Sequence, residues 1–167
     1  YTVVATDTGV TGCTDTANIT INAAPLAIGD CAHGGFVFYL DGNGGGLVCA
    51  INNVTGSTSA CEKWSYRGDF SVAPTTSTST AFGTGQANTN AIVAGYPTPI
   101  QSYAAGLAND HMNYDDSCGG TYTDWYLPSI DELRRLYANR DLINKALNVI
   151  GGTTLLGHAS YWSSTEN

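Results

Sequence analysis

The chain has 167 residues and a formal net charge of −8; only 12% of its residues are charged, while 43% are hydrophobic. The charged share is about half that of an average soluble domain, so threonine, serine, asparagine and glycine must supply most of the polar surface. This composition is typical of extracellular β-rich proteins. The negative charge argues against nucleic acid and anionic membranes as partners. No run of about 18 apolar residues occurs, which argues against membrane insertion.

The first 24 residues have the pattern of a β-hairpin. Two β-rich runs, YTVVA (1–5) and ANITINA (17–23), flank the turn cluster DTGVTGCTD. Two strands cannot bury a core alone, so we expect residues 1–24 to be the last strands of a β-sandwich repeat whose earlier strands are missing. The pattern resembles the end of the PKD-like or immunoglobulin-like repeats of bacterial surface adhesins. Residues 25–27 are the expected linker.

A second unit is expected over residues 28–167, and it begins with two apolar strands. GGFVFYL (34–40) and GGLVCAIN (45–52) are joined by DGNGG, a glycine-rich hairpin turn. Residues 53–82 are rich in serine and threonine and predict a long surface loop anchored by Trp64.

Helical patterns follow this loop. Residues 83–96 predict a helix after Gly85, with Ala87, Ala91 and Ile92 facing inward. Residues 99–110 predict a second helix, and residues 111–123 a polar loop.

The segment DWYLPSIDELRRLY (124–137) predicts a strand that turns directly into a helix. Trp125 to Leu127 form a short bulky run, expected to be a buried strand end, and Pro128 keeps Leu127 extended. Ser129 and Glu132 have the spacing of a capping box. The apolar stripe expected to face the core consists of Ile130, Leu133, Leu136 and Tyr137.

The chain then predicts one more helix and the start of a strand. The helix spans about residues 140–150 and ends at Gly151 and Gly152 as C-cap residues. The final SYWSSTEN (160–167) reads as a strand start that stops abruptly.

Four ordered motifs carry a family resemblance over residues 28–167. They are GDCAHGGFVFYLDGNGGGLVCA, GTGQANTNAIV, DWYLPSIDELRRLY and YWSSTE. Together they resemble the domain of unknown function found at the C-terminus of the Legionella collagen-like adhesin. The resemblance implies an α+β, C-type lectin-like fold with short mixed strands, long loops and two to four short helices. Because family members continue past YWSSTE with further strands, it also implies a domain truncated at its C-terminus. The three tryptophans sit inside or beside apolar runs and are expected in the core.

The five cysteines, at positions 13, 31, 49, 61 and 118, favour disulfides over a zinc site. They form no CxxC pair, and the three histidines lie far from them and from one another. We expect two disulfides among Cys31, Cys49, Cys61 and Cys118. Cys49–Cys61 is preferred because it closes a short loop, which leaves Cys31 with Cys118. The adhesin repeats that the hairpin resembles would pair Cys13 upstream.

Candidate ligand contacts fall in the loops. Asp41 and Asn43 supply oxygens at alternate positions, which suits either calcium or a plain hairpin turn. Asp115 and Asp116, with Asp110, form a second acidic group. Exposed aromatic rings can stack on sugars, and the loop tyrosines could do so or could anchor their loops. The candidates are Tyr66, Tyr114 and Tyr122. Calcium is the one cofactor considered, and no other is indicated.

The basic residues allow a weaker anion site. Arg134, Arg135, Arg140 and Lys145 fall together on the helical region, but Asp131 stands one turn before Arg134 and Arg135 and would partly neutralise them.

These observations favour a non-enzymatic extracellular or cell-surface role. No G-x-S-x-G elbow and no triad order occur. The leading hypothesis is a bacterial adhesin head that binds a polysaccharide or cell-surface glycan through the loops of its lectin-like domain. The alternative is a structural or assembly module, either as a homo-oligomer or as part of a filament, secretion or motility complex.

Overall fold

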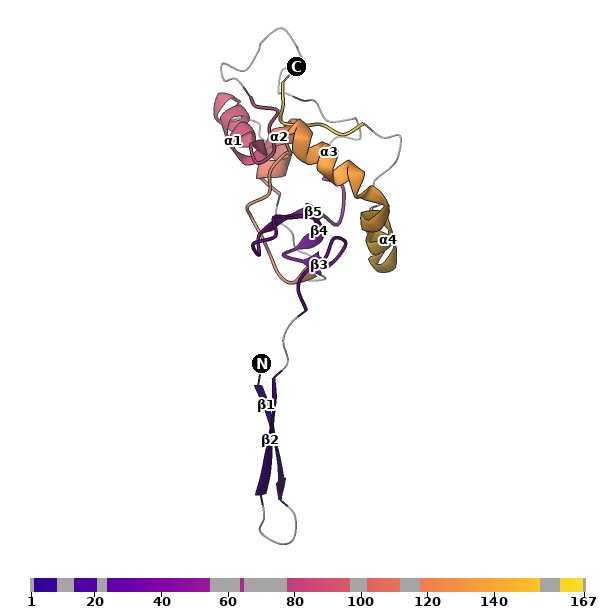
Figure 1. Ribbon diagram of the computed structural model, residues 1–167. Helices are drawn as coiled ribbons and strands as arrows, with labels where there is room; N and C mark the ends of the chain where they lie inside the picture. The colour runs from indigo at the N-terminus through magenta and orange to yellow at the C-terminus, as the bar shows by residue number, and fades with distance from the viewer. Residues whose placement is uncertain are drawn as a thin grey trace.

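The computed structural model describes residues 2–8, 14–20, 24–54, 64, 78–96, 102–111, 118–153 and 160–166, with backbone alone for 2–8 and 14–20. Within these residues the fold is mixed α+β, as predicted. It contains a two-stranded sheet, a three-stranded antiparallel sheet and four helices (Figure 1). None of the helices in the described part is long and apolar enough to cross a membrane.

The N-terminal hairpin is present. Strands β1 (Thr2–Thr8) and β2 (Thr14–Thr20) pair antiparallel from Thr2↔Thr20 to Thr8↔Thr14, in a sheet separate from the other strands (Figure 1). The hairpin itself is thus confirmed, while its assignment to a β-sandwich repeat and the boundaries at 24 and 28 stay predictions.

The second sheet has the order β3-β4-β5, so β5 forms one of its edges. Strands β4 (Gly35–Leu40) and β5 (Gly46–Ala50) are the two predicted apolar strands, and they are antiparallel. Strand β3 (Cys31–Ala32) was not predicted, because two residues are too short to show alternation. In the β4–β5 turn, Gly42 and Gly44 have φ of 79° and 95°, a conformation that favours glycine.

The first two helices are α1 (Gly85–Gly95) and α2 (Ala104–Asn109). Helix α1 buries Gly85, Asn88, Thr89 and Ile92, and Ala87 is exposed, so the inward face was assigned wrongly at Ala87. The polar pair takes that face because Asn88 and Thr89 bond to other segments. Helix α2 starts after the predicted 99, and residues 97–101 lie outside the described part.

Helices α3 (Ile130–Ala138) and α4 (Arg140–Ile150) follow one another with Asn139 between them. The capping box is confirmed, since Glu132 N donates to Ser129 Oγ and Ser129 N donates to Glu132 Oε2. Gly151, with φ of 75°, caps α4 as predicted. The inward stripe on α3 is wrong at Tyr137, which is 51% exposed.

Glu132 is fully buried and joins three segments. Its carboxylate accepts hydrogen bonds from Ser129 N (2.7 Å), Gly83 N (3.0 Å) and Tyr126 Oη (3.3 Å). Helix α1 starts so close to this point that a Cβ at Gly85 would overlap Glu132 Oε2 and lie 2.9 Å from Ser129 N. Glycine at 85 is therefore required by this close approach.

The predicted strand before α3 is absent. Residues 121–129 form no strand, and 160–166 form none either. Leu127 is held by the side chain of Thr89, which both donates to its carbonyl (3.1 Å) and accepts from its N–H (3.0 Å). Ser164 N donates to Pro128 O at 2.7 Å. Hydrogen bonds from side chains and from single backbone groups thus hold this segment, in place of the β-sheet pairing expected from its bulky apolar run.

Two hydrophobic clusters form the core of the described residues. One joins the sheet to α3 and α4: Phe36, Phe38, Ile51, Cys118, Ile143 and Leu147 are its buried members. The other joins α1 to α2 around Ile92, Tyr103 and Ala105, with Trp64 and Leu127 packed against it. Trp64 is anchored as predicted, with Nε1 donating to Ser163 O at 2.9 Å. Trp162, predicted in the core, is 43% exposed.

Candidate functional site

A partly open cavity of about 1090 Å³ is lined by residues of both hydrophobic clusters. It slightly exceeds the roughly 300–1,000 Å³ of typical small-molecule sites. Strands β4 and β5 line one wall, residues 122 and 124–128 line another, and residues of helices α2 and α3 and residues 160–162 also contribute.

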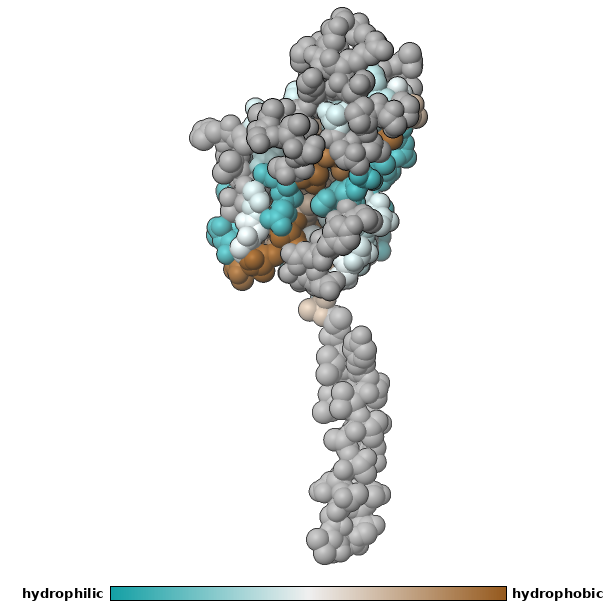
Figure 2. Space-filling view, turned by 180° about the vertical axis from the view of Figure 1, so that it is seen from behind, coloured by the Kyte–Doolittle hydropathy of each residue, from teal (hydrophilic) through white to brown (hydrophobic). Residues whose placement is uncertain are grey.

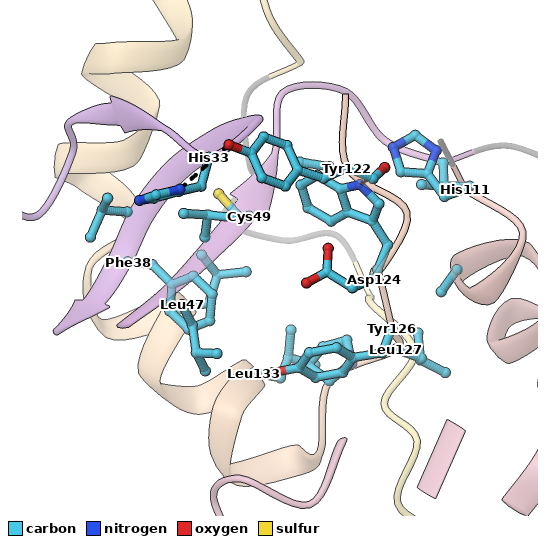
Figure 3. A pocket seen from close by; sticks show the side chains of 18 of the residues that line it. His33, Phe38, Leu47, Cys49, His111, Tyr122, Asp124, Tyr126, Leu127 and Leu133 are labelled. Atoms are coloured by element: carbon cyan, nitrogen blue, oxygen red, sulfur yellow. Dashed lines mark hydrogen bonds between the residues drawn. The ribbon is translucent and has the colours of Figure 1, made fainter. Parts of the chain in front are cut away.

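The sheet wall is formed mainly by β5. Gly46, Leu47, Val48, Cys49 and Ala50 all line the cavity. Successive side chains of a strand point to opposite faces, so five consecutive lining residues place the edge of β5 along the cavity. Figure 3 shows Phe38, Leu47 and Cys49 on this side.

The opposite wall carries the polar and aromatic groups. Tyr122, Asp124, Trp125 and Tyr126 follow one another on the extended segment before α3. In Figure 3 the Asp124 carboxylate points into the space between the two walls. Asp124 is the one acidic or basic side chain, histidine aside, among the described residues that line the cavity.

Hydrogen bonds and ring contacts hold the aromatic wall. Trp125 Nε1 donates to Tyr122 O at 3.1 Å, and the Trp125 ring meets His111 edge-on with centroids 5.4 Å apart. Tyr122 Oη lies 3.5 Å from His33 Nδ1 (Figure 3) and 3.3 Å from Gly119 O. These contacts therefore hold both Trp125 and Tyr122 of the aromatic wall in place.

Three titratable groups at the cavity are biased toward their neutral forms. Burial lowers the pKa of His111, and burial raises the pKa of the Cys49 thiol to about 12. Burial, followed by the nearby Glu132 charge, raises the pKa of Tyr126. A thiol with so high a pKa stays protonated and is a poor nucleophile. The cavity thus offers Asp124 as a fixed charge among neutral donors and acceptors.

The predicted ligand residues fall partly at this cavity. Tyr122 lines it, whereas Tyr66, Tyr114, Asp115 and Asp116 lie outside the described residues. His33, Asp124 and Trp125 were not predicted as site residues. Trp125 had been assigned to the core, but it is half-buried and lines the cavity. The signal that could have found the wall is the concentration of aromatic residues around Asp124 in TYTDWY (121–126).

At the candidate calcium residues, Asp41 serves the hairpin turn. Its Oδ1 accepts from Asn43 N (2.7 Å) and Gly45 N (2.9 Å), while Asp41 N donates to Gly45 O (3.0 Å). In the part of the chain that the structure describes, no group of three or more His, Cys, Asp or Glu side chains could hold a metal ion. The turn alone accounts for the positions of Asp41 and Asn43.

Of the predicted disulfides, Cys31–Cys118 is present, and it closes a separation of 87 residues. It ties β3 to the loop that enters the aromatic wall. Cys49 carries a free thiol, so its predicted pairing with Cys61 is not formed; Cys61 itself lies outside the described residues. The short-loop argument considered sequence separation alone, whereas Cys49 pairs with Phe36 in the sheet and packs against the first cluster.

A second, smaller groove of about 420 Å³ lies beside α3. Tyr39, Phe82, Asp131, Arg134 and Arg135 line it, together with Ala138. Arg134 Nη1 lies 2.8 Å from Asp131 Oδ1, so this arginine is partly neutralised as predicted. The groove is a weaker candidate than the larger cavity.

Comparison with known proteins finds no matching family model, no matching curated protein and no matching solved structure.

Proposed function

We propose that this chain is the non-enzymatic binding head of an extracellular adhesin with a lectin-like fold, and that it holds a glycan against the aromatic wall of the cavity. The observation that carries the proposal is the placement of Tyr122 and Trp125 on the same wall as the Asp124 carboxylate. A sugar ring presents an apolar face and a rim of hydroxyl groups. Aromatic rings stack on the apolar face, and a carboxylate accepts hydrogen bonds from hydroxyl groups.

Three further features support an extracellular glycan site. The disulfide Cys31–Cys118 suits an oxidising compartment. The cavity volume suits several sugar units. The four ordered motifs resemble a family of adhesin domains, and they include the segment that carries Trp125.

A glycan array tests the proposal with a matched pair of tyrosine variants. Tyr122→Ala removes a ring from the cavity wall, whereas Tyr137→Ala removes a half-exposed ring from α3 that does not line the cavity. We expect the wild type and Tyr137→Ala to bind the same glycans. Tyr122→Ala should lose about tenfold or more in affinity, since a stacked ring contributes on the order of 1 kcal/mol beyond its buried area.

Two outcomes would reject the proposal: an array without any wild-type signal, or equal signals from both tyrosine variants. Measuring the solution mass alongside the array tests the alternative of an assembly module, since a stable oligomer without any glycan signal would favour that alternative.

A further inference from the structure

Asp124 presents a carboxylate without a counter-charge to the space that a ligand would fill. The side chain is exposed, and its carboxylate points into the cavity (Figure 3). Among the described residues, no hydrogen bond and no ion pair engages this carboxylate. A ligand that fills the cavity removes water from the carboxylate, and an ionised group that loses its water without gaining a partner costs free energy.

The basic residues of the chain offer Asp124 little compensation. Four of the six lie on helices α3 and α4, and none of these four lines the cavity: Arg134, Arg135, Arg140 and Lys145. The other two, Lys63 and Arg67, lie outside the described residues, and in the sequence they stand close to Glu62 and Asp69. As far as the described residues line the cavity, the compensating positive charge therefore has to come from the ligand.

The aromatic rings beside Asp124 also suit a positive charge. Tyr122, Trp125 and Tyr126 line the same cavity, and the face of an aromatic ring attracts a cation. Tyr126 lies within the field of Asp124: its pKa is raised by burial first, by Glu132 next and by the Asp124 charge as well. These four groups belong to residues 122–126, all of them described, so one short segment brings the carboxylate and the rings together.

We infer, resting on the proposed function, that the glycan held at this wall carries a free, protonated amino group that pairs with Asp124. Asp124 is then the residue that determines specificity, and the class of ligand is an amino sugar that is not N-acetylated. A hydroxyl group can donate a hydrogen bond to the carboxylate, but only an ammonium group also neutralises its charge.

Other surfaces carry less. Figure 2 shows hydrophobic surface at the C-terminal end of α4, where Val149 is 85% and Ile150 41% exposed. Nothing among the described residues indicates what would cover that end, whereas the charge of Asp124 specifies the chemistry of its partner.

Three β-1,4-linked tetrasaccharides test the inference on the intact chain: those of glucosamine, of N-acetylglucosamine and of glucose. They differ only in the substituent at C2, which is an ammonium group in the first, a neutral amide in the second and a hydroxyl group in the third. Isothermal titration calorimetry at about pH 6, where primary amines are mostly protonated, measures their affinities.

Two variants separate the site from general attraction, because a chain with a net charge of −8 attracts any cationic oligosaccharide. Asp124→Asn removes the carboxylate in the cavity. Asp141→Asn makes the same change in charge on α4, at a side chain that is 83% exposed and does not line the cavity. A thermal melt checks that both variants are folded.

We expect the wild type and Asp141→Asn to bind the glucosamine tetramer about fivefold more tightly than the other two, as for one partly exposed charge pair with a cation–π contact. In Asp124→Asn the three affinities should agree within about twofold.

Four results would overturn the inference: no binding of the glucosamine tetramer, equal affinities of the wild type for all three, a preference that persists in Asp124→Asn, or one that Asp141→Asn abolishes equally. The glycan array distinguishes these results from failure of the proposed function. Array binding without an amine preference retains the glycan site and rejects the amino group alone, whereas an array without any signal rejects the site itself.

Discussion

Glu132, its hydrogen-bond partners and the start of helix α1 at Gly85 form a tightly packed corner. This corner and the wall from Tyr122 to Leu127 are close in the sequence but differ in how they pack. At the corner, a fully buried carboxylate accepts three hydrogen bonds and helix α1 packs so closely that only glycine fits at 85. Along the wall, half-buried aromatic rings border a cavity of about 1090 Å³. The corner thus has one well-determined arrangement, whereas the side chains of the wall are only partly covered and border a cavity. One motif can therefore determine the fold with one half and border a cavity with the other.

The largest expected effect on stability is that of removing the disulfide bond that holds the loop before the wall. The Cys31–Cys118 disulfide joins β3 to the loop that enters the wall. Replacing both cysteines with serine should cost about 2–5 kcal/mol of unfolding free energy, because the unfolded chain is no longer constrained. Chemical denaturation measures this loss. The control is Cys49→Ser, in which the disulfide is retained; if a reductant left the wild type as stable as before, the covalent tie would not matter.

The next effect tests the close packing at the corner. Gly85→Ala should cost about 3 kcal/mol, at the upper end for overpacking, because the new Cβ meets Glu132 and the Ser129 backbone. The matched control is Gly95→Ala in the same helix, where nothing lies within 4 Å of the added Cβ. That change should be neutral or mildly stabilising, since alanine favours helix. Equal melting temperatures for the two variants would contradict the packing account.

The sequence predicted those features of the fold that depend on neighbouring residues, and it missed those that depend on residues far away in the chain. The capping box, the Gly151 cap and the four described helices, α1 to α4, depend on spacings within a few residues. The sequence therefore predicted them. The burial of Asn88 and Thr89 was missed because their partners, such as Leu127, lie tens of residues away. The strand predicted over the apolar run at Trp125 is absent, and the position of this run beside a cavity depends on residues far away in the sequence, which no local pattern encodes.

The pH dependence of stability tests the same comparison, because Tyr126 lies on the wall and its hydroxyl donates a hydrogen bond to Glu132 at the corner. Its pKa is raised by burial first and by Glu132 second. The folded state therefore holds the phenol proton more tightly than the unfolded chain does. The resulting stability is fully present below the unfolded pKa of about 10 and is lost as the pH rises through the folded pKa. In Tyr126→Phe this alkaline loss should be smaller. Identical alkaline curves for the two proteins, measured by denaturation, would count against the assignment.

The smallest effect is expected at the helix cap. Ser129→Ala removes the side-chain acceptor for Glu132 N but leaves the Glu132 carboxylate bonds in place. The unfolding free energy should fall by about 1 kcal/mol, as measured by chemical denaturation. A loss as large as that of Gly85→Ala would mean that the cap organises the whole corner.

The most direct test of the central claim, that the wall binds and the corner supports, is glycan-array binding by Trp125→Ala, checked for folding by a thermal melt. Because Trp125 is half-buried beside the cavity, its removal should cost less than the roughly 3–5 kcal/mol of a fully buried tryptophan. We predict that the folded variant loses the wild-type glycan signal, while Ser129→Ala keeps that signal despite its lower melting temperature. A folded Trp125→Ala that binds as the wild type does, or a folded Ser129→Ala that does not bind, would contradict the account.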